Sequence, residues 1–162
     1  MVKLEKKCKS IQLVMTDVDG VLTDGGMFYS QNGEALKKFN TRDGMGMELL
    51  LEKNIKTIII TREKSKIVMT RAKKLKVFKT YVGIIEKESL LEKISNEFSI
   101  PVNQIAYIGD DVNDYEIMKR VGFSCAPNDA VDKIKKISDY VCKLKGGEGA
   151  FREMADLILS FK

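Results

Sequence analysis

Short apolar runs recur along this chain, and they constrain its fold more than any other feature of the sequence. They occupy residues 11–15, 57–60, 105–108 and 123–126, and segments with helical spacing of apolar side chains lie between them. Such runs are typical of strands buried on both faces of a parallel sheet. Because strands that alternate with helices require crossover connections, we predict an α/β protein with a parallel sheet.

The remaining pattern completes one domain. We expect short strands at 80–82 and 140–142, and helices at 45–53, 64–76, 87–98, 113–121, 130–137 and 150–161. Asn32-Gly33 lies between the apolar segments 27–29 and 35–39, which is typical of a hairpin with a type I′ turn. With no repeat or linker in view, we predict a single domain over residues 1–162 with a protruding hairpin at about 26–39.

The composition excludes several kinds of chemistry. There is no histidine, so imidazole catalysis and histidine-containing zinc sites are impossible. The three cysteines, Cys8, Cys125 and Cys142, are odd in number and lack CxxC spacing, so we expect free thiols in a reducing compartment. No segment approaches the roughly 20 apolar residues of a membrane span. We therefore expect a cytoplasmic protein with no membrane partner.

Positive charge is unevenly distributed along the chain. The formal net charge is +5, and the segment from Arg62 to Lys79 has eight basic side chains against one acidic one, Glu63. Such a segment suits an anionic partner, whether a phosphate, a sugar acid or a polyanion, or it is a face of solvated lysines. No alternation of aromatic and basic residues supports nucleic acid. We expect no nucleic-acid partner, and we expect much of the charge to face an arriving small anion.

Polar side chains follow the predicted strands at their carboxyl ends, where open parallel sheets bind ligands. Acidic residues follow the first strand and the strand at 105–108, a threonine follows the strand at 57–60, and a lysine begins a helix. The residues concerned are Asp17, Asp19, Thr61, Lys87, Asp110, Asp111 and Asp114. Four separate segments thus deliver carboxylates, a hydroxyl and an ammonium group to one edge of the sheet.

This set of groups points to phosphoryl transfer. Several neighbouring carboxylates repel one another unless a cation holds them, and oxygen ligands without His or Cys favour Mg²⁺. An aspartate such as Asp17 can accept a phosphoryl group and lose it to water, while Asp19 protonates the leaving oxygen. Lys87 and Thr61 would neutralise and hydrogen-bond the phosphoryl oxygens. The alternative is a coincidental set of turns and helix caps.

The same residues carry a family resemblance. The segment DVDGVLTDG at 17–25 resembles the first motif of the haloacid dehalogenase superfamily, and IIIT at 58–61, Lys87 and GDDVND at 109–114 resemble the other three. The resemblance implies a Rossmann-like sheet sandwiched by helices, with Asp17 as nucleophile and Asp19 as general acid and base. It also implies Thr61 and Lys87 as phosphate holders and a Mg²⁺ site. The implied ligands are Asp17, the Asp19 backbone carbonyl and Asp110, supported by Asp111 and Asp114.

A closer resemblance covers nearly the whole chain. Residues 24–50, Arg71 and GGEGAFRE at 146–153 are similar to the 3-deoxy-D-manno-octulosonate 8-phosphate phosphatase family, whose relatives act on nine-carbon ulosonate 9-phosphates. The intervals between the motifs leave no room for a cap domain. The resemblance implies a phosphatase for a 2-keto-3-deoxy sugar acid phosphate. The implied substrate-binding residues are Asn40, Thr41, Arg42, Asp43, Gly44, Arg71 and Lys87.

An uncapped site needs another cover, because open sites admit water. The resemblance implies a homotetramer built through the hairpin, with a neighbouring subunit closing each site. An apolar hairpin surface of Met27, Phe28, Tyr29 and Phe39 would serve as the interface, unless the hairpin folds on its own core. The glycine-rich residues 146–149 are either a mobile tail over an active site or a loop leading into the last helix.

The sequence departs from the family pattern in two places. Arg62 follows Thr61 where the family usually has glycine, which leaves the local geometry open. Glu63 stands where octulosonate enzymes usually carry arginine, and Glu63 with Lys74 resembles the nine-carbon enzymes instead. The eight- or nine-carbon substrate therefore stays open, as does the role of the basic N-terminus.

Two other functional classes compete with a phosphatase. A receiver-type signalling domain also combines strand-end acids, a phospho-accepting aspartate, threonine, lysine and Mg²⁺, but receivers place the acidic pair early and the phospho-aspartate in mid-chain. The other is an idle tetramerisation or regulatory domain, like those related to acylneuraminate cytidylyltransferases. Every catalytic position is filled here, which disfavours that class.

Overall fold

Six parallel strands form the central sheet of the protein, whose computed structural model describes residues 2–162. The strand order is β5-β4-β1-β6-β7-β8, so the chain starts near the middle and winds outward in both directions. The strands are β1 (Leu13–Thr16), β4 (Lys56–Ile60), β5 (Lys79–Tyr81), β6 (Ile105–Ile108), β7 (Phe123–Ala126) and β8 (Tyr140–Val141). The predicted α/β fold is confirmed.

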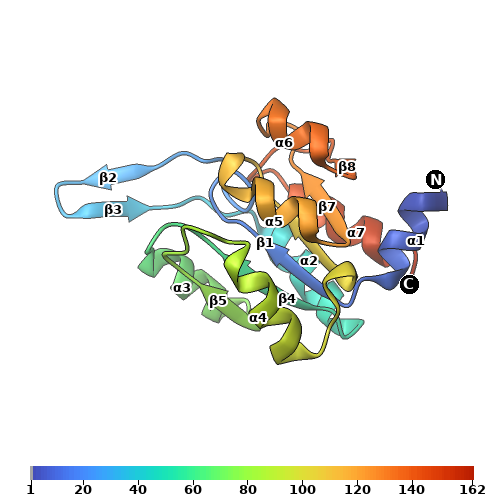
Figure 1. Cartoon of the computed structure of the whole chain (residues 1–162). Helices are drawn as coiled ribbons and strands as arrows, with labels where there is room; N and C mark the ends of the chain where they lie inside the picture. Colours follow the sequence, from blue (N-terminus) through green and yellow to red (C-terminus); the bar gives the residue numbers. More distant parts are fainter. Residues whose placement is uncertain (1) are drawn as a thin grey trace.

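Helices cover both faces of this sheet (Figure 1). The longer ones are α2 (Thr41–Glu52), α3 (Lys66–Lys74), α4 (Ser89–Phe98) and α7 (Ala150–Leu159). α1 (Val2–Ser10) precedes β1, the short helices are α5 (Tyr115–Arg120) and α6 (Asp132–Ile137), and single 3₁₀ turns lie at Val102–Gln104 and Val112–Asp114. Within residues 2–162, no helix combines the length and the apolar character that a membrane crossing requires.

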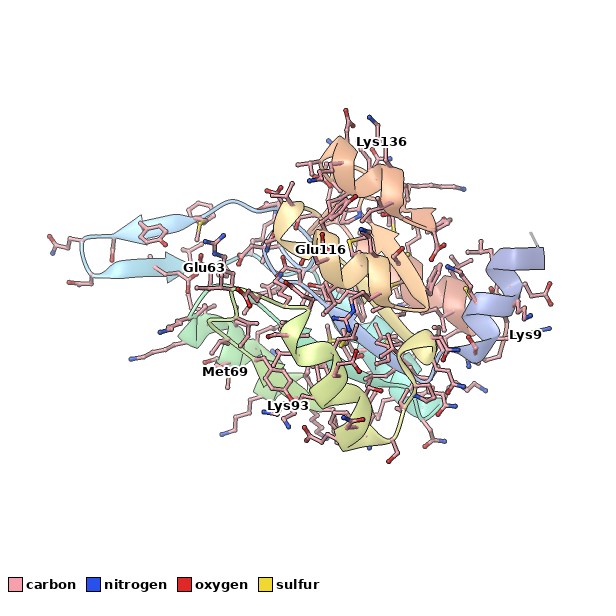
Figure 2. All side chains as sticks on the ribbon, viewed as in Figure 1. Lys9, Glu63, Met69, Lys93, Glu116 and Lys136 are labelled. Carbon is pink, nitrogen blue, oxygen red and sulfur yellow. The ribbon has the colours of Figure 1, made fainter. Side chains whose placement is uncertain are left out.

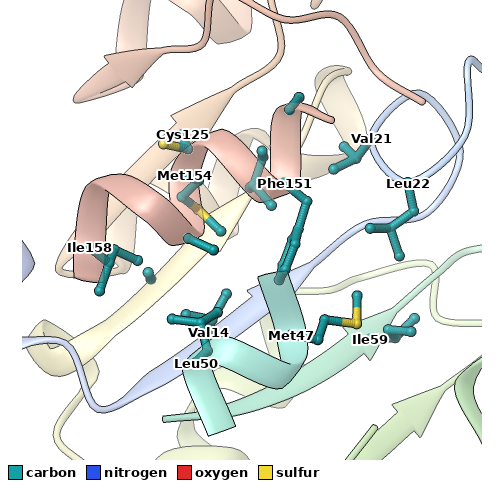
Figure 3. Packing of buried hydrophobic residues seen from close by; sticks show 14 of the residues in the cluster. Val14, Val21, Leu22, Met47, Leu50, Ile59, Cys125, Phe151, Met154 and Ile158 are labelled. Carbon is teal, nitrogen blue, oxygen red and sulfur yellow. The ribbon is translucent and has the colours of Figure 1, made fainter. Parts of the chain in front are cut away.

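Alternation along β1 divides the core into two layers. Val14 and its neighbours from α2 and α7, among them Leu50 and Phe151, fill the layer seen in Figure 3. Leu13 and Met15 point to the opposite face and pack with residues of α4, α5 and α6. Burial on both faces explains why these strands lack alternating polar residues.

The hairpin projects from the sheet as a separate two-stranded ribbon, formed by β2 (Phe28–Ser30) and β3 (Gly33–Leu36) (Figure 1). Ser30 pairs with Gly33, so the connecting residues are Gln31 and Asn32. The predicted type I′ turn is wrong, because it needs positive φ at both central residues and among residues 28–36 only Gly33 has it, at 103°. Gly33, the residue after the turn, is therefore the one with a positive φ in this hairpin.

Two helical segments were not predicted from the sequence. Residues 2–10 form α1, which the sequence did not indicate because charged side chains dominate it. Residues 41–44 are the first turn of α2, which begins before the predicted start at 45, since the side chain of Asn40 caps the helix by accepting a hydrogen bond from the Arg42 N–H at 2.9 Å. The three cysteines are free, as expected, and all are buried.

Candidate active site

The predicted catalytic residues meet at the carboxyl ends of β1, β4 and β6. In this strand order β1 and β6 are neighbours from which the chain departs in opposite directions, the position where such sheets bind ligands. A cavity of about 280 Å³ opens there. Its lining consists of Asp17, Asp19, Gly20, Gly25, Met27, Thr61, Arg62, Glu63, Asp110, Asp111 and Asn113.

Asp17 follows β1 directly and is almost fully buried. Its Oδ1 accepts the Val18 N–H at 2.7 Å, and its Oδ2 lies 2.8 Å from the Lys87 ammonium. Burial raises the pKa of Asp17 well above its usual range, and the nearby Asp114 carboxylate raises it further, against the opposing effect of Lys87. A cation at this carboxylate would relieve that penalty.

Lys87 is fully buried, is not among the residues that line the cavity, and joins two carboxylates. Its Nζ is 2.8 Å from Asp17 and 2.7 Å from Asp114. Burial lowers the pKa of Lys87, but the two carboxylates outweigh it and raise the pKa above that of a free lysine. The ammonium group therefore stays charged and holds Asp17 in place.

Tyr107 is a member of this site that the sequence did not reveal. It sits within the apolar strand β6, and its hydroxyl donates to Asp114 Oδ1 at 2.6 Å. The Asp110 N–H donates to the other oxygen of Asp114 at 3.0 Å. Both oxygens of Asp114 therefore contact the protein, where they join Lys87, Tyr107 and the Asp110 backbone. No sequence signal distinguishes Tyr107 from an ordinary core aromatic.

The carboxylates fit a hard divalent cation. Asp17, Asp110 and Asp114 have oxygen atoms within 4.8 Å of one another. Burial, with Asp114 and Asp111 close by, raises the pKa of Asp110 to about 7. These three carboxylates could hold a metal ion together, and an all-oxygen set of this kind suits Mg²⁺. Asp111 is exposed and caps the following 3₁₀ turn through the Val112 N–H at 2.6 Å.

Asp19 and Thr61 face the same cavity. The Asp19 carboxylate lies 2.5 Å from the ammonium of Lys37, a residue that the sequence did not single out. Thr61 follows β4, is fully buried, and its hydroxyl accepts the Glu63 N–H at 3.2 Å. Figure 2 shows the labelled Glu63 where the hairpin meets the body of the protein.

The predicted substrate-binding residues at 40–44 and Arg71 are not among those that line this cavity. They form a joint between α2, α3 and α7 instead. Asp43 Oδ1 accepts the Arg152 N–H at 3.0 Å, near the start of α7. Arg71 donates to the Asn40 carbonyl at 3.4 Å and lies over the ring of Phe39, 5.7 Å from its centre. Their role in substrate binding stays a prediction.

Residues 146–149 form the loop that leads into α7. The Gly147 N–H donates to the Val21 carbonyl at 2.9 Å, and the Gly146 N–H donates to Asp129 at the same distance. A Cβ on Gly146 would lie 1.9 Å from the Gly20 carbonyl oxygen, so only glycine fits this approach. The segment thus supports the loop after Asp19 within its own chain. Of the two alternatives, the structure has the loop that leads into the last helix and not a mobile tail.

The basic segment contributes less to the cavity than expected. Of its positive residues only Arg62 lines the cavity, beside Glu63. Lys64 packs against Gly83, where a Cβ would lie 2.9 Å from its side chain. Lys74 is exposed in the last turn of α3 and does not line the cavity with Glu63. Most of this positive charge therefore lies outside the cavity, contrary to the expectation.

A Rossmann-like sheet with a buried aspartate after its first strand, a lysine paired with that aspartate and a second acidic loop after its fourth strand is typical of haloacid dehalogenase-like hydrolases. The family profile of that description matches residues 49–154. The buried aspartate follows the first strand and the second acidic loop comes late in the chain, which is not the order found in a receiver domain.

Individual relatives narrow this class. The chain is 39% identical over 156 residues to the 3-deoxy-D-manno-octulosonate 8-phosphate phosphatase of Haemophilus influenzae, covering 96% of this chain and 87% of that one. The cobalt-bound structure of the Haemophilus enzyme has a TM-score of 0.93 at 39% identity, over 96% of this chain and 91% of the other.

A further structure, from Moraxella catarrhalis in complex with a magnesium ion, a phosphate ion and a KDO molecule, has a TM-score of 0.96. It is 34% identical and covers 100% of this chain and 93% of the other. The chain belongs to the 3-deoxy-D-manno-octulosonate 8-phosphate phosphatase family, and it is a phosphomonoester hydrolase.

Proposed function

We propose that this protein hydrolyses the phosphate monoester of a 2-keto-3-deoxy sugar acid in the presence of Mg²⁺. The observation that carries the proposal is the buried Asp17, held by Lys87 and facing Asp110 across adjacent strands. The two substrates that fit the family are 3-deoxy-D-manno-octulosonate 8-phosphate and a nine-carbon ulosonate 9-phosphate. The relatives named above support this class of substrate.

Asp17 is the nucleophile of the proposed reaction. Its carboxylate attacks phosphorus, the ester P–O bond breaks, and the departing alkoxide takes a proton from Asp19. Lys87 holds Asp17 in position, and Thr61 hydrogen-bonds a phosphoryl oxygen. Bound Mg²⁺, held by Asp17, Asp110 and the Asp19 backbone carbonyl, would neutralise the charge of the transferring group.

Water completes the cycle. Asp19, now ionised, takes a proton from a water molecule as that water attacks the phosphorus of the aspartyl-phosphate. The P–O bond to Asp17 breaks, inorganic phosphate leaves, and Asp19 is again protonated. Protons and phosphate therefore balance with one water consumed per ester cleaved.

The proposal includes a cytoplasmic homotetramer assembled through the hairpin. Phe28 and Tyr29 are 52% and 63% exposed on β2, and Leu36 is 51% exposed on β3. Apolar side chains so exposed on a projecting ribbon favour contact with another protein surface. Phe39, which the sequence suggested for this interface, packs against the core instead, and Leu36 takes its place in the proposed surface.

The test is phosphate release from a panel of eight- and nine-carbon 2-keto-3-deoxy acid phosphates, with and without Mg²⁺. We expect Mg²⁺-dependent turnover with at least one member of the panel. A preference for the nine-carbon substrates would agree with the resemblance of Glu63 to the nine-carbon enzymes. Asp17→Asn and Asp19→Asn should each lose activity by at least about 100-fold. A wild-type protein without Mg²⁺-dependent turnover on the whole panel would remove the proposed function.

A further inference from the structure

A buried lysine adjoins the proposed general acid. Lys37 directly follows β3 at the root of the hairpin, and its side chain is 1% exposed. Its ammonium lies 2.5 Å from Asp19 Oδ1 and 2.9 Å from Glu34 Oε1. Neither the family motifs at the strand ends nor the roles assigned above account for this lysine.

Glu34 ties Lys37 to the body of the protein. One oxygen of Glu34 contacts Lys37, and the other accepts a hydrogen bond from the Ser65 hydroxyl. The Ser65 oxygen in turn accepts the Val68 N–H at 3.2 Å and so caps α3. Because α3 is packed on the core through Val68 and Ala72, this series of contacts fixes the Lys37 ammonium relative to the sheet.

An ammonium group in this position needs a reason beyond packing. Burying a charged group costs free energy that the paired carboxylates only offset, and an apolar side chain could fill the same space at lower cost. Asp19, by contrast, needs restraint, since across residues 2–162 its carboxylate has no second side-chain hydrogen-bond partner. Its side chain is 24% exposed, so without Lys37 it would be free to turn in the open cavity.

We propose that Lys37 is a positioning residue that holds the Asp19 carboxylate where it can exchange a proton with the leaving oxygen and with water. Glu34 orients Lys37 for this purpose. The proposal rests on the proposed function, because it assumes that Asp19 transfers the proton. It adds that the root of the hairpin is part of the catalytic apparatus.

Leaving-group dependence separates positioning from mere structural support. An alkyl phosphate such as 3-deoxy-D-manno-octulosonate 8-phosphate needs its alkoxide protonated, whereas p-nitrophenyl phosphate releases a stable anion. The constant kcat/KM covers the steps up to departure of the leaving group. In Lys37→Met we expect kcat/KM to fall about 10- to 100-fold for the alkyl ester and no more than about threefold for the aryl ester.

Three further variants complete the design. Asp19→Asn should show the same asymmetry more strongly, Lys37→Arg should restore part of the alkyl activity, and Glu34→Gln should show the asymmetry more weakly. Lys38→Met is the matched control, because Lys38 is the adjacent lysine, 65% exposed and paired with Asp24 at 2.8 Å. It should keep both activities. The conservative variants Lys37→Arg and Glu34→Gln also keep the test decisive if Lys37→Met does not fold.

Specific outcomes decide between the possibilities. Equal loss of alkyl and aryl activity in Lys37→Met, tracking a lower melting temperature, would overturn the positioning role and leave the proposed function intact. Unchanged activity on both esters would overturn it as well. A wild-type protein that hydrolyses neither ester with Mg²⁺ would instead contradict the proposed function itself.

Discussion

At the scale of single residues, the site depends on how buried charges are paired. Lys87 has no contact with water and is neutralised by Asp17 and Asp114 on either side. Such a group costs free energy to bury, yet its removal costs more, because two carboxylates are then left facing each other without a cation. In the proposed mechanism, Lys87 therefore contributes to stability and to catalysis through the same contacts.

Removing Lys87 should destabilise the fold, and bound Mg²⁺ should restore part of the lost stability. We expect Lys87→Met to lower the free energy of unfolding by about 3–5 kcal/mol in the presence of a chelator. Mg²⁺ should recover part of that loss, because it binds the folded state. Urea denaturation with and without Mg²⁺ measures both quantities.

The control for this prediction is a lysine in an exposed ion pair. Lys79 contacts Glu97 at the surface, and Lys79→Met should cost no more than about 1 kcal/mol, with no response to Mg²⁺. Equal losses in the two variants, or a Lys87→Met protein as stable as the wild type, would contradict the pairing described above.

At the scale of elements, Asp43 joins the start of α2 to the start of α7. Its Oδ1 accepts the Arg152 N–H, while its Oδ2 is buried without a hydrogen-bond partner among residues 2–162. Burial raises the pKa of Asp43 to about 6, although the Arg152 N–H and the charges of Arg71 and Arg152 oppose the rise. A carboxyl with a raised folded-state pKa stabilises the fold when protonated, so its contribution is complete at low pH and is lost as the pH rises.

The pH dependence of stability tests this joint. Between the ordinary aspartate pKa and about 6, the folded state holds a proton that the unfolded state has released, so stability falls as pH rises through that interval. Asp43→Asn keeps an acceptor for Arg152 and does not titrate. The stability of wild type minus that of Asp43→Asn should therefore fall by about 2 to 3 kcal/mol between pH 4 and pH 7. A flat difference would show that Asp43 is not perturbed.

Elements differ in how far the sequence reveals them. The buried strands were predictable because apolar runs such as 57–60 leave few alternatives, and the acids after β1 and β6 followed from the strand ends. The first turn of α2 was not, because Gly44 and its polar neighbours resemble a loop, while the Asn40 cap and the contact of Asp43 with α7 accompany a helical turn. Gly46 sits so close to α7 that a Cβ would lie 3.2 Å from Arg152.

Tyr107 and Lys37 escaped prediction for a different reason. Tyr107 looks like any aromatic in a buried strand, and Lys37 looks like a surface lysine at the end of a hairpin. Their roles arise from partners distant in the sequence, Asp114 and Asp19, which only the folded chain brings into contact. Patterns along the sequence indicate secondary-structure preference and burial. They do not indicate side-chain contacts between residues that are distant in the sequence.

At the scale of the whole molecule, the hairpin projects beside a site that no cap domain covers within residues 2–162 (Figure 1). The root of the hairpin, at Met27, lines the cavity, while Phe28 and Tyr29 are exposed beyond it. A ribbon so placed can both assemble subunits and limit access of water to the site. This links the proposed tetramer to catalysis through one element.

Charge on the hairpin should disrupt that assembly. We expect the wild type to sediment and scatter light as a tetramer at micromolar concentration, and Phe28→Asp to shift most of the protein to smaller species, because a carboxylate is costly to bury in an apolar contact. Lys38→Met, near the same root, should leave the mass unchanged. A monomeric wild type, or a tetramer that survives Phe28→Asp, would rule out the hairpin as the interface.

The central claim is that Asp17 carries the phosphoryl group, and trapping that group tests it most directly. Substrate labelled in its phosphate with a radioactive isotope is mixed with enzyme and Mg²⁺, quenched in acid within one turnover, and the protein-bound label is mapped by peptide analysis. The aspartate mechanism predicts label on the peptide that contains Asp17 in the wild type and none in Asp17→Asn. Turnover by the wild type without any protein-bound label, or label that persists in Asp17→Asn, would contradict it.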